Sequence, residues 1–414
     1  MNILYLSQYF PPESGATQMR AFEMARNWVA AGHNVTVITE VPNHPAGVIF
    51  PTYRNRLIVR DTIEGIDVIH VWVKTAKHKT SLTRILFYVT YMINAVISAL
   101  VVTRLKYDLV FASSPPLFVG AAGALIATIR KIPLIFDVRD LWPSAAVQLG
   151  ELGNKSAIIA AEALERYIYR KSQLIVPVTR GLYRELVKRG VPSDKLVTIT
   201  NGTNTSVFQF DGQERKKWRD KFSVNESDCL VLYAGLLGLQ YDLDSLLQTA
   251  KSLNSHKNIK FVIVGDGPKR LGIEQEIADS QMTNVELVSQ QPMDHMPGIY
   301  SASDISIIPL REIDLFASTI PVKLFDSWAC ERPVILSSPM GEASSILEEA
   351  NGGIHIQPGD TEQMIEEIRS LAANSDDRHK MGISGRDYVC KHFDRAVLAN
   401  KLIDRLTRLH EEGD

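Results

Sequence analysis

The chain has 414 residues, which favours two domains of about 200 residues each over a single core. With 45% hydrophobic and 22% charged residues and no low-complexity tract, its composition is that of a folded globular protein. Three cysteines far apart in the sequence fit neither a disulfide framework nor a zinc site, and they suit a reducing cytoplasm. The net charge of −2 hides an asymmetry. Residues 1–200 carry 23 basic against 14 acidic residues (+9), and the remainder carries 22 against 33 (−11). Either only the first half faces an anionic partner, or the two surfaces have diverged by chance.

Short apolar runs typical of strands alternate with helix-like segments in both halves, which predicts two parallel, doubly wound α/β sheets. In the first half the expected strands are residues 2–7, 35–40, 66–73, 109–115, 133–138 and 174–178. In the second half they are residues 229–235, 260–265, 285–289, 305–310 and 333–338. The polar stretch 200–214 has no periodicity and is the expected hinge. We therefore expect one domain over 1–203 and another over 204–394. By analogy with other two-domain proteins, a last helix over about 395–414 is expected to pack back on the first domain.

A helix start follows the first expected strand. After the loop Pro11–Gly15, a helix is expected from Ala16 to a C-cap at Gly32. Gly15 lets the backbone approach a ligand closely, and the exposed amides of a helix start favour an anion such as the phosphate of a nucleotide sugar. A plain strand-to-helix turn explains the same residues. The G-x-G-x-x-G pattern of dinucleotide-binding folds is absent, which disfavours a dehydrogenase.

Charged residues follow a later strand. Asp137, Arg139 and Asp140 lie at its carboxyl end, the edge where open α/β sheets bind ligands. Asp140 is a candidate to bind a sugar hydroxyl or to act as a base toward an acceptor, and Arg139 is a candidate partner of a phosphate or of Asp140. The alternative is an Asp–Arg pair that only holds the loop.

The strongest signal lies in the stretch 319–331. Pro321 suits the first turn of a short helix, and Thr319 is its expected cap. Lys323 and Asp326 are three residues apart and therefore share one face of this helix. A carboxylate there accepts hydrogen bonds from both hydroxyls of a ribose, and a lysine neutralises a leaving pyrophosphate. A surface ion pair is the alternative, but the segment is otherwise too apolar for an ordinary surface.

Two glycine-rich turns follow strands of the second half. The first carries Gly235 and Gly238, and the second carries Gly265, Asp266 and Gly267. Each turn allows close backbone contact with a diphosphate or a base. One such turn is a weak signal, but the two in this order form a strong one.

The segment Ser81–Val102 is apolar, with Arg84 as its one internal charge and basic residues on both sides. Its length approaches the ~20 residues that span a bilayer, but a span is disfavoured because the strand at 109–115 must follow at once. The segment is therefore either a buried crossover helix or a helix that docks on an anionic membrane surface. His44, in PNHPAG, is a candidate to line the entrance for an acceptor, although a loop histidine is more often simply solvated.

The order of these motifs resembles glycosyltransferase family 4, with the GT-B fold, over almost the whole chain. The resemblance rests on PPESGATQMRAFEMARNWVAAGHNVTVIT, FDVRDLW, TNGTNTSVF, YAGLLG, VGDGP and IPVKLFDSWACERPVI. PNHPAG and RDLWP are similar to the branch that builds bacterial O-antigen, capsule and colanic acid, and within it to N-acetyl-L-fucosamine transferases. The resemblance implies two Rossmann-like doubly wound domains that face an interdomain cleft. The first would bind the acceptor and the second the nucleotide sugar.

The resemblance also implies the chemistry. It implies transfer with retention of configuration, no metal or cofactor, a UDP- or GDP-sugar donor with UDP expected, and a polyprenyl-diphosphate-linked acceptor at the inner face of the cell membrane. Ser318 stands where the family's E-x7-E motif has its first glutamate, and Arg139 stands where many members have the histidine of a His-Asp pair. Leu236 takes the place of a basic phosphate ligand, which passes that role to Lys323.

Together these arguments give the expected site. The catalytic candidates are Asp140, Arg139 and Lys323; the donor-binding candidates are Gly15, Ala16, Asn201, Gly235, Gly238, Gly265, Asp266, Ser318, Thr319, Ile320, Pro321, Val322 and Asp326; and His44 is expected at the acceptor.

Two rival interpretations stay open. A sugar-nucleotide epimerase of the same fold would release a free sugar and need no acceptor. A non-catalytic sugar-nucleotide-binding protein would explain why Ser318 and Leu236 replace a glutamate and a basic residue. Nucleic-acid binding is disfavoured, because no basic–aromatic motif occurs and the pI is about 6.6.

Overall fold

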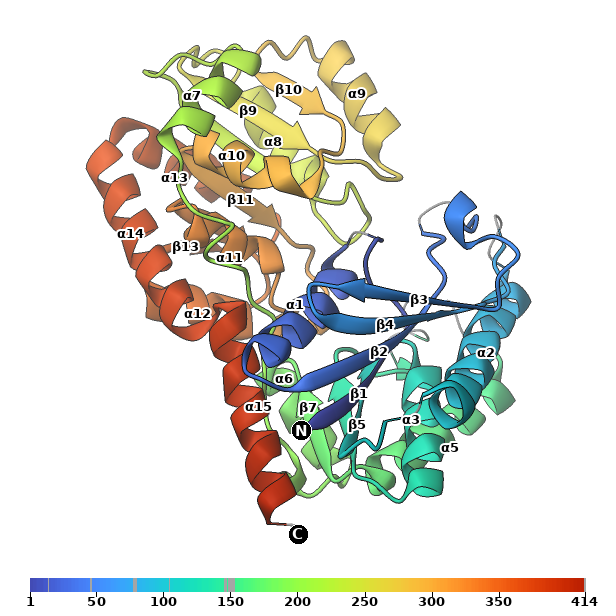
Figure 1. Ribbon diagram of the computed structural model, residues 1–414. Coiled ribbons are helices and arrows are strands. Elements are labelled where there is room, and N and C mark those ends of the chain that lie inside the picture. Colours follow the sequence, from blue (N-terminus) through green and yellow to red (C-terminus); the bar gives the residue numbers. More distant parts are fainter. Residues whose placement is uncertain are drawn as a thin grey trace. The chain divides into compact units, whose positions relative to one another are not determined.

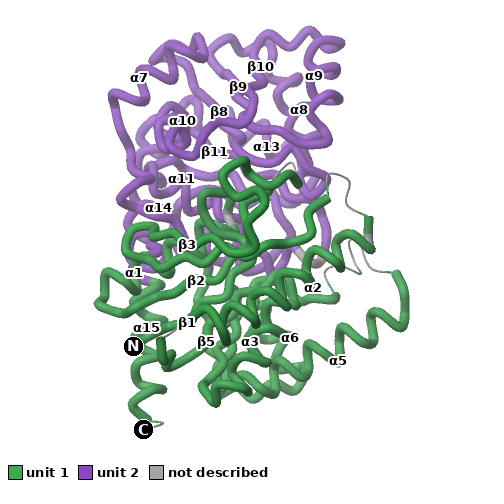
Figure 2. The backbone as a smooth tube through the Cα atoms, turned by 45° about the vertical axis from the view of Figure 1, so that its right-hand side comes forward, with its two compact units in different colours: residues 1–200, 398–414 green, residues 201–397 purple. Residues whose placement is uncertain are grey.

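The computed structural model describes residues 1–13, 15–44, 47–76, 80–103, 105–144, 147 and 153–412. The chain forms two compact units: unit 1 is Met1–Thr200 with Leu398–Asp414, and unit 2 is Asn201–Val397 (Figure 2). The division falls inside the expected hinge, slightly before the expected boundary at residue 203. Each unit holds one sheet between layers of helices (Figure 1), so the predicted class of two Rossmann-like α/β domains is confirmed.

The sheet of unit 1 has the strand order β3-β4-β2-β1-β5-β6-β7. Its strands are β1 (Asn2–Ser7), β2 (Asn34–Glu40), β3 (Ile58–Ile63), β4 (Ile66–Val71), β5 (Leu109–Ser114), β6 (Leu134–Val138) and β7 (Leu174–Pro177). All neighbours run parallel except β3 and β4, which form an antiparallel hairpin. The sequence did not predict β3, because this edge strand is largely exposed and lacks a buried apolar run. From β4 to β7 the order is that of a Rossmann fold, with its switch point between β1 and β5.

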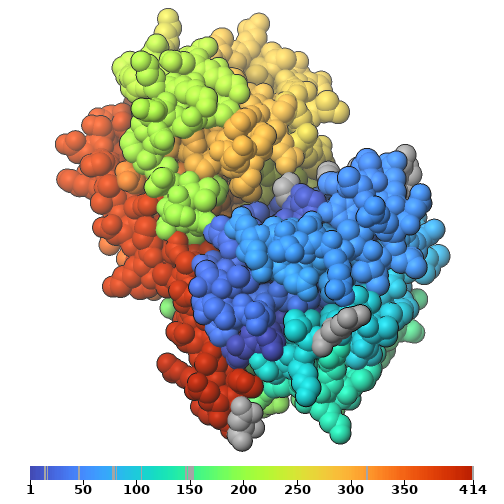
Figure 3. Space-filling model, in the orientation of Figure 1, coloured from blue at the N-terminus to red at the C-terminus, as the bar shows by residue number. Residues whose placement is uncertain are grey.

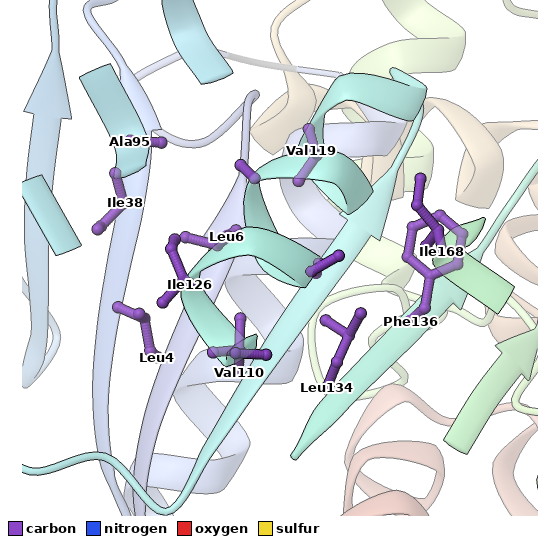
Figure 4. Packing of buried hydrophobic residues seen from close by; sticks show 14 of the residues in the cluster. Leu4, Leu6, Ile38, Ala95, Val110, Val119, Ile126, Leu134, Phe136 and Ile168 are labelled. Atoms are coloured by element: carbon purple, nitrogen blue, oxygen red, sulfur yellow. The ribbon is translucent and has the colours of Figure 1, made fainter. Parts of the chain in front are cut away.

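Helices cover both faces of this sheet. They are α1 (Ala16–Ala30), α2 (Ser81–Ile97) continued by a π-helical turn (Ser98–Val102), α3 (Leu117–Arg130), α5 (Lys155–Lys171), α6 (Arg180–Lys188) and most of α15 (Arg395–Glu411), with 3₁₀ turns at Pro51–Tyr53 and Ser193–Lys195. Residues of α2, α3 and α5 share one buried cluster with the sheet, part of which Figure 4 shows. Residues of α1 and α15 form the cluster on the other face.

The closest helix-to-sheet packing in unit 1 depends on two glycines of α3. A Cβ atom on Gly120 would lie 2.6 Å from the ring of Phe136, and one on Gly123 would lie 2.9 Å from the Cβ of Ala112. These distances are shorter than atoms tolerate, so the absence of side chains lets α3 lie directly on β5 and β6.

The last helix, α15, belongs to unit 1 from Leu398 onward. Leu398, Ala399, Leu402 and Leu406 are buried in the same cluster as α1, and the indole of Trp28 donates a 3.1 Å hydrogen bond to the Ala399 carbonyl. In the space-filling view this red segment lies against the blue N-terminal part of unit 1 (Figure 3).

Unit 2 repeats the architecture with six parallel strands in the order β10-β9-β8-β11-β12-β13. They are β8 (Cys229–Ala234), β9 (Ile259–Val264), β10 (Val285–Val288), β11 (Ile305–Pro309), β12 (Val334–Ser337) and β13 (Gly353–Ile356). The helices are α7 (Gly212–Lys221), α8 (Leu243–Ser252), α9 (Arg270–Asp279), α10 (Met296–Ala302), α11 (Val322–Ala329), α12 (Glu342–Ala350), α13 (Thr361–Ala373) and α14 (Ser375–His392), with 3₁₀ turns at Met293–His295 and Asp314–Ser318. The short strand β13 is half-buried, and the sequence analysis missed it. The switch point lies between β8 and β11.

A matched pair of Gly→Ala substitutions tests the close packing of α3. Gly120→Ala should lower the free energy of unfolding by about 1–3 kcal/mol, because its methyl group overlaps Phe136. Gly272→Ala, on the exposed side of α9 with no atom within 4 Å of the new Cβ, should raise it by about 0.5–1 kcal/mol. Urea unfolding followed by circular dichroism measures both. Equal effects of the two substitutions would contradict the packing argument.

Candidate functional site

The predicted site residues of both units lie just beyond strand ends. In unit 1, Gly15 follows β1, and Arg139 and Asp140 follow β6. In unit 2, Gly235 follows β8 and Gly265 follows β9, next to the switch point of that sheet. Carboxyl ends of strands near a switch point are where open α/β sheets bind ligands.

A buried ion pair organises this edge of unit 1. The Asp137 carboxylate accepts hydrogen bonds from the Arg20 guanidinium at 2.8 Å and from the Ser113 hydroxyl at 2.7 Å. Arg20 also donates to the carbonyls of Ile199 and Thr200, at 3.1 and 2.9 Å. The pair therefore ties α1 to β5, β6 and the last residues of the first half. The sequence analysis considered an Asp–Arg pair that only holds the loop, whereas the partner of Asp137 is Arg20 of α1, which no sequence motif marked.

Arg139 points instead to the start of α1. Its guanidinium lies 3.3 Å from the Thr17 hydroxyl and 3.5 Å from the Thr17 carbonyl. Its buried Nε atom has no hydrogen-bond partner among the described residues. Burial and, after it, the positive charge of Arg20 lower the pKa of Arg139. Asp140, the candidate base, is exposed.

The start of α1 can accept an anion. Gly15 is the N-cap residue, no side chain of a described residue caps the helix, and its first turn carries no acidic residue. Ala16 is the first helical residue. With Arg139 bonded to Thr17, a cation lies beside the uncapped amides, which is the arrangement that favours a phosphate group.

The candidate acceptor residue His44 is exposed, and its backbone N–H donates to the Glu13 carboxylate at 2.7 Å. The same oxygen of Glu13 accepts from the Asn43 N–H at 2.6 Å, and the Asn43 side chain bonds Glu40 at 2.7 Å. These buried acids fix the loop that carries His44, and sequence reasoning missed them because they belong to no charge pair or periodic pattern.

The two glycine turns of unit 2 pack against each other. The Gly235 N–H donates to the Val264 carbonyl at 2.9 Å, and the Leu237 N–H donates to the Asp266 carbonyl at 2.8 Å. A Cβ atom on Gly265 would lie 1.9 Å from the Gly235 carbonyl oxygen. The two turns can therefore make this contact only because Gly265 has no side chain, whether or not a ligand is bound. A Cβ atom on Gly238 would meet two side chains, those of Gln240 at 2.4 Å and Leu236 at 3.1 Å, and no backbone atom is among these nearest neighbours.

Lys323 of α11 reaches the first of these turns. Its buried Nζ atom lies 3.9 Å from the ring centre of Tyr241 and 4.3 Å from that of Tyr233, and a Cβ on Gly235 would lie 2.6 Å from it. It has no hydrogen-bond partner within the part of the chain that the structure describes. Burial lowers the pKa of Lys323 to about 7, against the opposing effect of Asp326. This environment differs from the surface ion pair considered as the alternative.

Asp326 is partly buried on the same helix. Its Oδ1 atom accepts a 2.6 Å hydrogen bond from the hydroxyl of Thr203, at the start of unit 2. Burial raises the pKa of Asp326 to about 6, and the Thr203 bond and the charges of Arg395 and Lys323 oppose the rise. The second carboxylate oxygen leaves acceptor capacity for a ligand hydroxyl.

Five of the remaining candidates lie at the start of α11 or directly before it. Ser318 ends the 3₁₀ turn before α11, Thr319 follows it, and Val322 is the first residue of α11. Ile320 is buried in a core cluster, and Pro321 is a buried N-cap residue. The expected capping role of Thr319 is wrong, because Pro321 occupies the cap position and no side chain of the described residues caps α11.

Two further candidates lie outside α11. Asn201 is the half-buried first residue of unit 2. Asp266 is exposed, and its carboxylate accepts from the Gly267 N–H at 2.7 Å.

Two family models match the chain, one in each half. The Glycosyl transferase 4-like domain matches residues 15–202, and Glycosyl transferases group 1 matches residues 214–388. The colanic acid biosynthesis glycosyl transferase WcaI of Escherichia coli is 22% identical over 378 residues, which cover 89% of this chain and 91% of WcaI.

Solved structures share the fold over the full length. Sucrose-phosphate synthase from Thermosynechococcus elongatus superimposes with a TM-score of 0.76 at 16% identity, covering 99% of both chains. HepE of Anabaena, solved with UDP and glucose, gives a TM-score of 0.72 at 15% identity and covers 99% of this chain and 100% of HepE. The chain is therefore an enzyme, a glycosyltransferase of the GT-B fold built from a 4-like domain and a group 1 domain.

Proposed function

We propose that this glycosyltransferase moves a sugar from a UDP-linked donor to a lipid-linked saccharide in the synthesis of a bacterial surface polysaccharide. The proposed donor sugar is N-acetyl-L-fucosamine or a related amino sugar. The reaction is metal-independent and retains the configuration of the sugar. The observation that carries the proposal is the pair of groups on α11: an amine at Lys323 with no hydrogen-bond partner among the described residues, and a carboxylate with acceptor capacity at Asp326.

These two groups suit the two parts of a nucleoside diphosphate. The Lys323 amine stabilises the negative charge that develops on the leaving diphosphate, and Asp326 accepts hydrogen bonds from the ribose. Within unit 1, the anion-accepting start of α1 and Arg139 form a separate candidate phosphate-binding element. The acceptor then attacks from the face that the diphosphate leaves, with Asp140 as the candidate base. The likeness to WcaI over most of both chains supports the polysaccharide assignment, and the UDP bound to HepE supports the choice of nucleotide.

A thermal-shift screen of UDP-, GDP- and ADP-sugars tests the donor class. UDP-sugars should raise the melting temperature in a concentration-dependent way, because a ligand that binds only the folded state stabilises it by mass action. Asp326→Asn should reduce the shift, since it removes the charged acceptor for the ribose hydroxyls. A shift with GDP- or ADP-sugars alone would overturn the choice of UDP.

The contribution of Lys323 to the reaction can be measured directly. Lys323→Ala should lower turnover by at least ~10²-fold, the order seen when one preorganised donor of a charged transition state is deleted. Lys251→Ala removes the same charge from an exposed site on α8 and should leave turnover unchanged. Rates of UDP release with the donor found in the screen provide the comparison. Near-normal turnover of Lys323→Ala would contradict the proposed role.

The lipid-linked acceptor is supported by an apolar surface of unit 1. Residues Leu82–Val102 form a helix of 21 residues with a mean hydropathy of 2.1, enough by length and composition to cross a membrane, and 28% of its most apolar stretch is buried. One face packs into the core through Phe87, Tyr91 and Ala95. The opposite face carries exposed apolar side chains at helical spacing: Leu82, Ile85, Leu86, Ile93, Ile97 and Val101, with Leu125 and Ile129 exposed on the adjacent α3.

This surface fits an anionic membrane better than a buried crossover alone. A helix that served only as a crossover would not need a face on which the exposed side chains are apolar. Exposed Lys74, Lys106 and Lys131 lie before and after the two helices. Basic residues beside an apolar helix face are typical of peripheral binding to anionic lipid, so we propose that the enzyme works at the inner face of the cell membrane. The flanking residues 77–79 and 104 lie outside the described residues.

Vesicle sedimentation tests this membrane surface. At low salt the enzyme should sediment with vesicles that contain anionic lipid and much less with neutral vesicles. The double variant Leu86→Glu/Ile93→Glu should lose this binding, whereas Leu271→Glu, at a 78% exposed residue on α9 of unit 2, should keep it. Equal partitioning into both vesicles, or no effect of the double variant, would remove the membrane from the proposal.

A further inference from the structure

Within the described parts of the chain, the groups around the Lys323 amine offer it no hydrogen-bond acceptor. Two aromatic rings face its Nζ atom, those of Tyr241 and Tyr233, and Gly235 closes a third side. The Tyr233 hydroxyl is itself engaged, since it donates to the Leu236 carbonyl at 2.6 Å. The faces of aromatic rings attract a cation but accept no strong hydrogen bond, so the three N–H groups of an ammonium here keep unmet capacity.

On the basis of the proposed function, we propose that Tyr233 and Tyr241 are positioning residues that hold the Lys323 amine for the donor diphosphate, and that this amine takes up a proton when the diphosphate binds. The rings fix where the nitrogen lies, and the phosphate oxygens supply the hydrogen-bond acceptors that the rings lack. The bound anion also supplies the opposite charge that stabilises the protonated form.

Burial and the charges around the amine together determine whether the amine gains a proton on binding. Its own helix contributes Asp326, which favours the charged amine, while Tyr233 and Tyr241 contribute no charge near neutral pH. The charge of Arg395 lowers the pKa of Asp326, and Asp326 in turn helps to raise the pKa of the buried Tyr300. Burial dominates and lowers the pKa of Lys323 to about 7 in the free protein. A diphosphate raises this pKa again. Above pH 7 the free amine is therefore mostly neutral and the bound amine charged, so binding consumes a proton.

Titration calorimetry with UDP alone measures this proton. At pH 8.5 the phosphates of UDP are already fully ionised, because the second ionisation of a phosphate has a pKa of about 6. The binding enthalpy, plotted against the ionisation enthalpy of three or more buffers, should give an uptake close to one proton. The affinity of UDP should fall by up to about tenfold for each pH unit above 7, until the pKa of the bound amine is reached.

Substitutions at Lys323 and Tyr241 distinguish the contribution of the amine from that of the aromatic rings. Lys323→Met should abolish the proton uptake and weaken UDP binding by roughly tenfold or more. Lys323→Arg keeps its charge at every accessible pH, so its UDP affinity should no longer depend on pH in this range. Tyr241→Phe keeps the ring and should keep the uptake. Tyr241→Leu admits water to the amine, which raises the pKa of the free state and should reduce the uptake at pH 8.5.

The outcomes distinguish this inference from the proposed function. If UDP does not bind, the donor assignment itself fails. If UDP binds to the wild-type protein at pH 8.5 with no proton uptake, or if Lys323→Met takes up the same proton, the inference is wrong while the donor assignment stands. If the folded Tyr241→Leu variant retains the full uptake, the positioning role of the rings is wrong. Circular dichroism verifies the fold of each variant.

Discussion

The buried amine of Lys323 is the constraint on which the candidate site depends. A buried group that is charged and lacks an acceptor costs several kcal/mol, and a protein normally removes such a group or gives it a partner. Here the surroundings are two tyrosine rings and a glycine. The surrounding fold tolerates this cost, which is the usual mark of a functional rather than a structural residue. Arg20 differs in this respect, because its buried charge is balanced by Asp137 within unit 1.

Much of the architecture could be predicted because it rests on buried apolar runs. The strands that the sequence analysis named are all present, since central parallel strands are apolar on both faces. β3 and β13 were missed for the corresponding reason: one is an exposed edge strand with Arg60 and Asp61 in it, and the other is a half-buried four-residue strand. Propensity and periodicity carry little information about elements that bury so little.

The positions of several site residues could be predicted from the sequence, but their hydrogen-bond partners could not. Position after a strand end pointed to Gly235 and Gly265, and the structure places them directly after β8 and β9; Pro321 pointed to the helix start, and α11 begins at Val322. The bond from Thr203 to Asp326 joins residues 123 apart in the sequence, and no local pattern records it. The role of Gly265 also changed, since its missing side chain makes room for the Gly235 carbonyl before any ligand arrives.

The path of α15 has a consequence for biosynthesis. This helix begins with the last residues of unit 2 and continues as part of unit 1, where it covers Trp28. A ribosome that has finished the first 200 residues has therefore not yet made the segment that closes their second apolar face. Until residues 398–406 emerge, the part of that face that α15 covers in the finished protein stays exposed to water while unit 2 is being translated. The N-terminal half of the enzyme is thus the first to be synthesised and the last to be completed.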